Sequence, residues 1–262
     1  MTDNIQGKQI KVGKLNVHYF TAGNGEPLVV IHGGGGGARG WLQNVAELGE
    51  HYTIYVPDLP GFGHSQPMDS DYDTSKFAQF VEDFTERLGL KRFHLVGHSA
   101  GGGIALRYAL KSPHKIDKLV LVSSMCLGRE IALWIRVLSS AVFCQSLGVA
   151  GVALLKAIKW LADLVYAPLK FVNPLPQAKV GLGARMVTLR EQSTVLVSQL
   201  SQLMMPTLLV WGANDGIVPV SQAYAAARVI TDCQVHVFEG CGHSVYKQRV
   251  KEFSHLLATF LD

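Results

Sequence analysis

A serine framed by glycines lies between an apolar run and a helix-like run near the middle of this chain. The segment 97–101 reads Gly-His-Ser-Ala-Gly, which fits the pattern G-x-S-x-G, and it follows the apolar run 93–96. A serine hydroxyl becomes a useful nucleophile when a sharp strand-to-helix turn exposes it to a base. Small residues at 97 and 101 leave room for that turn. The segment therefore predicts a nucleophile elbow with Ser99 at its tip, with a simple helix cap as the competing interpretation.

Two later loops carry the partners that such a serine needs. In this arrangement the acid and the histidine follow the serine in that order, each after a later strand. A buried strand over 206–211 leads to Asp215, and the next strand, over 233–238, leads to His243. His243 would take the proton from Ser99, and Asp215 would orient the imidazole and stabilise its charged form. The order predicts a catalytic triad of Ser99, Asp215 and His243.

Other acids and histidines fit these roles less well. Asp58 precedes Ser99 in the chain, and we expect it to order the turn that follows it. Asp117 lies before a predicted strand, over 118–122, instead of after one. His32 and His64 lie in glycine-rich turns, and we expect them to brace loops rather than to act as bases.

Backbone amides beside the elbow are expected to bind the negative charge of a tetrahedral intermediate. Each such donor typically contributes about 3 kcal/mol. One is the amide of Ala100, and the other comes from the loop after the strand 28–31. In this loop His32 is followed by glycines at 33–37, which allow conformations that a side chain would forbid. A phosphate-binding loop is the alternative, but no G-K-[ST] follows.

Together these features resemble the α/β-hydrolase superfamily, in the branch with a single inserted cap. The resemblance covers nearly all of residues 8–262 except the cap. In that family the second oxyanion donor is usually the second residue after the loop histidine, which corresponds to Gly34. The matching residues are Ser99, Asp215, His243, the His32-Gly33 loop and the run 58–63, Asp-Leu-Pro-Gly-Phe-Gly.

The loop 32–41 also looks like that of the meta-cleavage-product hydrolases, which split carbon–carbon bonds in ring-fission products. Those enzymes commonly have Asn before the nucleophile and Trp after the catalytic histidine, whereas this chain has His98 and Ser244. Because the nucleophile is a serine and not an aspartate, the similar haloalkane dehalogenases and epoxide hydrolases are disfavoured.

The order of elements predicts an α/β fold, the α/β-hydrolase fold, with a mostly parallel eight-stranded sheet flanked by helices and a helical cap insertion. A chain of 262 residues can bury a substantial core. We expect a core domain over 1–125 and 201–262 and the cap, or lid, over 126–200. An opening hairpin over 8–12 and 15–21 precedes strands near 28–31, 52–56, 92–97, 118–123, 206–211 and 233–238. The triad would meet at the carboxyl ends of these strands.

The cap segment is basic and partly apolar. It carries eight basic and three acidic residues, so its charge is +5 while the rest of the chain carries 16 − 17 = −1. An anionic substrate or an acidic membrane would explain this, as would ordinary surface lysines and arginines. The run Val137–Leu155 holds no charge, but its Ser, Gln and Gly residues favour a lid over an acyl pocket instead of a membrane span.

Four residues are candidates for substrate contacts: Gly35, His98, Arg185 and Arg190. Arg185 and Arg190 could clamp a carboxylate. His98 adjoins Ser99 on the elbow and should point away from its hydroxyl, so packing is its competing role.

These features predict a serine hydrolase that cleaves a carboxylic ester, thioester or lactone with an apolar part through an acyl-enzyme. Carbon–carbon bond hydrolysis is the first alternative. A slow-turnover ligand receptor and an acyltransferase or perhydrolase share the same fold and triad.

The expected partner is a small-molecule substrate, and we expect neither a metal nor an organic cofactor. A net charge of +4 without a basic stripe argues against nucleic acid, and membrane contact is not favoured. We expect a monomer or homodimer. The polar residues 1–9 lack the apolar core of a signal peptide, and the four cysteines have no metal-ligand spacing, so a cytoplasmic location is expected.

Overall fold

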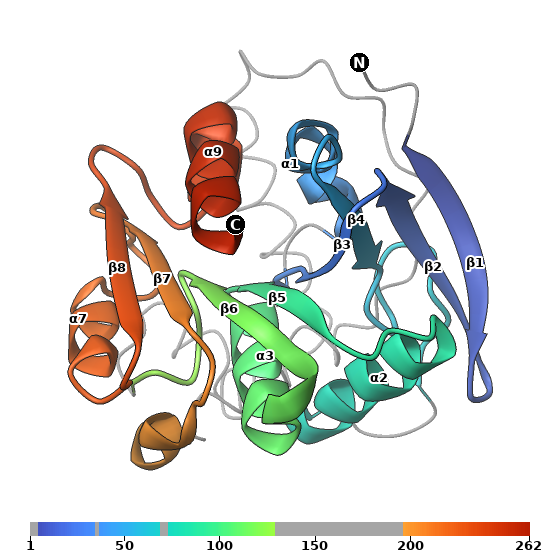
Figure 1. The fold of residues 1–262 in the computed structure, drawn as a ribbon, viewed down its shortest axis with the longest axis horizontal. Coiled ribbons are helices and arrows are strands. Elements are labelled where there is room, and N and C mark those ends of the chain that lie inside the picture. The colour runs from blue at the N-terminus through green and yellow to red at the C-terminus, as the bar shows by residue number, and fades with distance from the viewer. Residues whose placement is uncertain (1–4, 35–36, 69–72, 129–195) are drawn as a thin grey trace, which may run out of the picture.

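The strands expected from the sequence form one eight-stranded sheet in the computed structural model of the chain (Figure 1). The structure describes residues 5–34, 37–68, 73–128 and 196–262. The strands lie in the order β1-β2-β4-β3-β5-β6-β7-β8. Their bounds are β1 Gln6–Val12, β2 Leu15–Ala22, β3 Glu26–Ile31, β4 Tyr52–Pro57, β5 Phe93–His98, β6 Ile116–Val122, β7 Thr207–Gly212 and β8 Cys233–Phe238.

The sheet is parallel apart from its first strands. β1 and β2 form the expected antiparallel hairpin, and β2 pairs antiparallel with β4. The remaining neighbours pair in parallel. Every residue of β5 and of β7 is buried, as expected for parallel strands covered on both faces. The predicted fold class is therefore confirmed.

Helices cover both faces of the sheet (Figure 1). One face carries α2, α3 and α7, and the core there includes Phe77, Tyr108 and Trp211. The other carries α1, α8 and α9, with Trp41 and Phe253 in the core. The bounds are α1 Leu42–Leu48, α2 Thr74–Arg87, α3 Ala100–Lys111, α7 Ser221–Ala227, α8 Val245–Gln248 and α9 Val250–Leu261, with short 3₁₀ helices η1 Ala38–Trp41, η2 Pro113–Lys115 and η5 Val197–Gln202.

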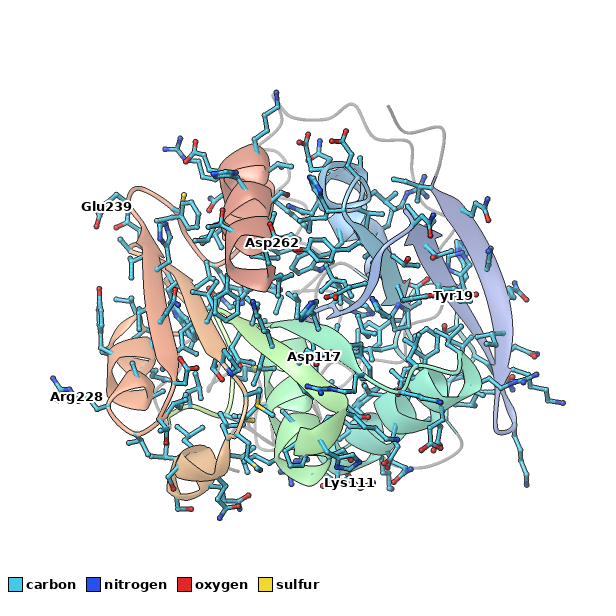
Figure 2. All side chains as sticks on the ribbon, viewed as in Figure 1. Tyr19, Lys111, Asp117, Arg228, Glu239 and Asp262 are labelled. Atoms are coloured by element: carbon cyan, nitrogen blue, oxygen red, sulfur yellow. The ribbon has the colours of Figure 1, made fainter. Side chains whose placement is uncertain are left out.

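Charged side chains lie around this layered core. Arg228 and Glu239 lie at the outer edge beside α7 and β8, and Lys111 lies at the end of α3 (Figure 2).

Asp117 is paired with Arg92 at 2.5 Å. Because β6 begins at Ile116, two residues earlier than predicted, Asp117 lies at the amino end of this strand, away from the edge where the site was expected.

The predicted cap falls largely outside the described residues, as do Gly35, Arg185, Arg190 and the run Val137–Leu155. The two flanks of the segment 129–195 meet, because the Leu196 amide donates a hydrogen bond to the Cys126 carbonyl at 3.0 Å. The predicted boundary between 200 and 201 falls within η5. Among the described helices, none is long and apolar enough to span a membrane.

Two glycines let β5, α3 and β3 approach each other closely at the elbow. A Cβ added to Gly97 would overlap the Gly101 carbonyl oxygen and lie 2.7 Å from the Ala105 Cβ. A Cβ added to Gly101 would overlap the carbonyl oxygens of Ile31 and His32. The absence of side chains at 97 and 101 is thus a packing requirement, as the sequence pattern predicted.

We predict that Gly101→Ala destabilises the protein, although alanine is intrinsically favoured over glycine in a helix by about 1 kcal/mol. The steric conflict with two backbone oxygens should outweigh this gain and lower the free energy of unfolding by about 3 kcal/mol. Urea denaturation measures the change. Gly216→Ala is the matched control, since its added Cβ meets nothing within 4 Å; equal stabilities of the two variants would contradict the prediction.

Candidate active site

Ser99 sits at the tip of a strained turn between β5 and α3. Its backbone angles, φ 55° and ψ −120°, lie in a region that residues other than glycine rarely occupy. Its amide donates to the Val122 carbonyl at 2.9 Å. Its own carbonyl accepts from the amides of Gly102, Gly103 and Met125 at 3.0 to 3.2 Å. The neighbouring chain therefore holds the turn in place, as a nucleophile elbow requires.

The structure brings Ser99, His243 and Asp215 into one hydrogen-bonded chain. The Nε2 atom of His243 lies 2.9 Å from the Ser99 Oγ, and its Nδ1 lies 2.9 and 3.1 Å from the two Asp215 oxygens. Since a carboxylate only accepts, Nδ1 carries the proton and Nε2 accepts from the serine hydroxyl. This is the tautomer that lets the imidazole remove a proton from Ser99.

The Asp215 side chain is fully buried, whereas 15% of the His243 side chain remains accessible. Burial raises the pKa of Asp215, but hydrogen bonding and charge from His243, together with the amides of Val218 and Ile217, outweigh it and leave the pKa below its ordinary value. Those two amides donate to Oδ1 at 3.0 and 2.9 Å. The carboxyl group is therefore held in its charged form beside the imidazole.

The loops after β7 and β8 are fastened to each other. The Asn214 amide donates to the Cys241 carbonyl at 2.8 Å, and the Ala213 amide donates to the Phe238 carbonyl at 3.0 Å. A Cβ on Gly212 would overlap the carbonyl oxygens of Cys241 and Gly242. These contacts fix the distance between the acid and the histidine, which lie 28 residues apart in the chain.

The predicted oxyanion donors lie next to the elbow. Ala100 is the first residue of α3, a position whose amide has no acceptor within its own helix. Gly33 packs directly on the elbow, because an added Cβ would lie 3.0 Å from the Ser99 Cβ. Gly34 follows in the same loop and is partly exposed. The turn thus brings two stretches of backbone to the side of the serine.

His98 is buried and contacts the loop that carries His243. Its Nε2 donates to the His243 carbonyl at 2.9 Å, and its ring packs against those of His243 and Tyr246 at 4.9 and 4.8 Å between centroids. Burial is the main cause that lowers the His98 pKa to about 3, followed by the charge of His243. A neutral, enclosed ring favours the packing role over substrate contact. Sequence patterns could not reveal this bond, since its partners are 145 residues apart.

Two of the remaining polar candidates, His32 and Asp58, brace the loops around them, as predicted. His32 accepts from the Leu59 amide through Nε2 at 3.0 Å and donates through Nδ1 to the Gly33 carbonyl at 2.8 Å. Burial lowers its pKa, against the opposing effects of Gly33 and Asp58. Asp58 accepts from the amides of Ala38 and His64 at 2.9 and 3.1 Å. These bonds position the glycine-rich loop and the turn beside it.

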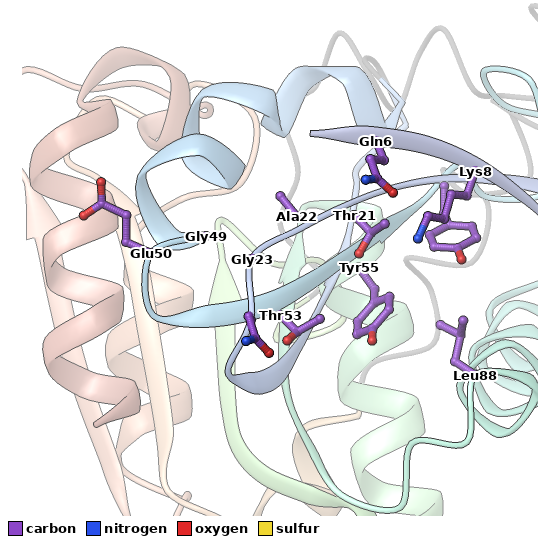
Figure 3. A pocket seen from close by; sticks show the side chains of 12 residues that line it. Gln6, Lys8, Thr21, Ala22, Gly23, Gly49, Glu50, Thr53, Tyr55 and Leu88 are labelled. Carbon is purple, nitrogen blue, oxygen red and sulfur yellow. The ribbon is translucent and has the colours of Figure 1, made fainter. Parts of the chain in front are cut away.

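A pocket of about 610 Å³ lies on the strands β1, β2 and β4 and the end of α2 (Figure 3). Thr53 and Gly49 place it at the amino end of β4. Ser99 follows the carboxyl end of β5, which runs in the same direction as β4. The pocket is therefore at the opposite end of the sheet and forms no part of the triad site.

The profile of the α/β-hydrolase fold family matches residues 26–173, more than half of the chain. With the sheet order and the elbow geometry described above, this match identifies the class of protein. The chain belongs to the α/β-hydrolase family, and some of its relatives are named as hydrolases.

Three proteins illustrate what the chain is similar to. It is 29% identical to a 2-hydroxy-6-oxononadienedioate/2-hydroxy-6-oxononatrienedioate hydrolase of a Pseudomonas species, over 95% of this chain and 93% of that protein. It is 26% identical to a 2-hydroxy-6-oxo-6-phenylhexa-2,4-dienoate hydrolase of Comamonas testosteroni, over 100% of this chain and 99% of that protein. The crystal structure of a bacterial membrane phospholipase A superposes with a TM-score of 0.74 and 27% identity, over 100% of this chain and 87% of that protein.

We predict that His98→Leu lowers kcat by about 10- to 100-fold with little change in KM, because the His243 backbone loses the donor that positions it. His98→Gln keeps an N–H donor near the place of Nε2 and should recover most of the rate. Steady-state kinetics with thermal unfolding of each variant separates positioning from stability. A His98→Gln variant no faster than His98→Leu, at equal stability, would show that the hydrogen bond does not matter.

Proposed function

We propose that the protein is a serine hydrolase that cleaves a carboxylic ester, thioester or lactone with an apolar part through an acyl-enzyme. The observation that carries this proposal is the hydrogen-bonded chain from the Ser99 hydroxyl through His243 to the buried Asp215 carboxylate. The strained Ser99 backbone supports it, because such strain is typical of an exposed nucleophile.

In the first half of the reaction, the Ser99 Oγ attacks the substrate carbonyl carbon while its proton passes to the His243 Nε2. The tetrahedral intermediate then breaks its bond to the leaving group, and His243 returns the proton to the leaving oxygen or sulfur. In the second half, water attacks the acyl carbon and gives a proton to His243. This second tetrahedral intermediate then breaks its bond to the Ser99 Oγ, His243 returns the proton to that oxygen, and the acid leaves. Asp215 stays ionised throughout and stabilises the charged imidazole.

The negative charge of each intermediate is bound by the backbone amides of Ala100 and Gly34 in this proposal. Removing one such donor typically costs on the order of 3 kcal/mol of transition-state stabilisation. The position of Ala100 at the start of α3 and the packing of Gly33 on Ser99 support this assignment. The same helix start adds its positive dipole end to the site.

The similarity to a membrane phospholipase A, at 27% identity across the whole chain, supports the hypothesis that the substrate is an ester. A phospholipase A acts on a carboxylic ester, the bond type proposed here. An apolar lid over the site, expected from the uncharged composition of the run 137–155, would suit an acyl chain.

Carbon–carbon bond hydrolysis is the second candidate, and it is supported about as well. The two dienoate hydrolases among the relatives align along nearly the full chain at 29% and 26% identity. The arginines at 185 and 190 could then clamp a substrate carboxylate. In place of the Asn and Trp that commonly flank the catalytic residues of that subfamily, this chain has His98 and Ser244.

Pre-steady-state release of p-nitrophenol from a ladder of esters, acetate through decanoate, tests the proposal. We expect a burst that approaches one equivalent of enzyme, followed by turnover, with the preferred chain length reporting the size of the acyl pocket. Ser99→Ala should abolish both phases.

The competing candidate is tested in parallel by the loss of dienoate absorbance from a ring-fission product. Turnover of the dienoate at a kcat/KM well above that of every ester would move the assignment to carbon–carbon hydrolysis. Folded protein with neither activity would contradict both candidates and favour a ligand-receptor role.

A further inference from the structure

Two histidines and a buried carboxylate converge outside the triad site. His18 lies in β2, while Asp58 and His64 lie in the turn that follows β4. Each of the three residues offers one potential ligand atom, and these three atoms all lie within 4.8 Å of one another. Within the described part of the chain, these three residues form the one such group of metal-ligating side chains. We propose that His18, Asp58 and His64 form a site for a divalent transition-metal ion of the Zn²⁺ type.

The backbone holds the first two ligands side by side. The Asp58 amide donates to the His18 carbonyl at 2.8 Å, and the His18 amide donates to the Ser65 Oγ at 2.9 Å. In consequence the His18 Nδ1 and the Asp58 Oδ2 are already 2.9 Å apart. The site is therefore built on a strand and a turn that are fixed to each other before any ion arrives.

The separation of the ligand atoms is close to what tetrahedral coordination needs. Zn²⁺ binds imidazole nitrogen and carboxylate oxygen at about 2.0 to 2.1 Å, which puts two ligands of a tetrahedron about 3.3 Å apart. The His18 and Asp58 atoms would separate by a few tenths of an ångström. His64 is exposed, and its ring centroid is 5.1 Å from that of His18, so a small side-chain rotation brings it to the ion.

The ligand chemistry also suits Zn²⁺. Two neutral imidazoles and one carboxylate are a common set for this ion, with water in the fourth position. In the present arrangement the His18 Nδ1 carries a proton that it donates to Asp58. Coordination requires that Nδ1 release this proton to water and that Nε2 take one up, which leaves the imidazole neutral. The Nε2 atom of His18 faces Gly7. A Cβ at Gly7 would lie 3.0 Å from Nε2, so the absence of a side chain there leaves room for the proton on Nε2.

Solvent reaches the cluster from the side of His64. A surface pocket of about 650 Å³ is lined by Gly61, Gly63, His64 and Ser65, together with residues of the neighbouring strands. The side chain of His18 is 14% exposed and that of Asp58 is 5% exposed. Of the three proposed ligands, His64 lines this pocket.

The ion would act on stability, since the cluster lies outside the hydrogen-bonded chain of Ser99, His243 and Asp215. Asp58 uses its second oxygen, Oδ1, to accept the Ala38 amide at 2.9 Å, and Ala38 directly follows the glycine run 33–37. An ion bound at Oδ2 leaves that bond intact and replaces the hydrogen bond between His18 and Asp58 with coordination to both residues and to His64. Occupancy should therefore stabilise the fold around the glycine-rich loop without taking part in bond cleavage.

Competition with a chromogenic chelator during titration with ZnSO₄ tests the site on the full chain. We expect one equivalent of Zn²⁺ with micromolar affinity and a rise in Tm on binding. His64→Ala should weaken the affinity by about 10-fold or more and reduce the rise in Tm. This variant keeps the backbone and the His18–Asp58 hydrogen bond, so it should fold normally.

His114→Ala is the matched control, because His114 is also exposed but lies on η2, outside the cluster. It should bind Zn²⁺ like the parent protein. The proposal is overturned if the parent protein takes up no Zn²⁺ at about 100 µM ZnSO₄, or if His64→Ala binds the ion as tightly as His114→Ala does.

Discussion

The left-handed backbone of Ser99 is the constraint on which the rest of the site depends. Holding a residue other than glycine in this region costs on the order of 1 to 3 kcal/mol. Hydrogen bonds from Ser99 to Val122 and from the amides of Gly102, Gly103 and Met125 to Ser99 hold it there. The turn can form only because Gly97, Gly101 and Gly33 carry no side chains. The glycines around the serine thus allow the turn that places its hydroxyl 2.9 Å from the His243 Nε2.

The second requirement is that an acid and a histidine from separate loops meet that hydroxyl. Parallel strands solve this problem, because β5, β7 and β8 all end at the same edge of the sheet. The hydrogen bonds between the loops at Asn214 and Cys241 then fix the spacing. Burial of Asp215 alone would raise its pKa, so the charged form depends on the four hydrogen bonds that its oxygens accept from His243, Ile217 and Val218.

Local pattern and chain order were enough to predict the strands and the three residues that meet at the site. Apolar runs in a covered parallel sheet are nearly continuous, which is why predicted and observed strand ends differ by only one or two residues at most positions. Roles that depend on contacts across the chain were beyond such patterns. His98 donates to a carbonyl 145 residues away, and His18 meets Asp58 across 40 residues, so neither contact leaves a local signature. The candidate contacts Gly35, Arg185 and Arg190 lie outside the described residues and stay predictions.

Intact-protein mass spectrometry during turnover of p-nitrophenyl butyrate, quenched in acid, tests the proposed acyl-enzyme most directly. We predict a mass increase of one butyryl group, which peptide mapping assigns to the segment that contains Ser99, and no adduct in Ser99→Ala. Formation of p-nitrophenol with no adduct, or with the acyl group on another residue such as Cys241, would contradict Ser99 as the nucleophile.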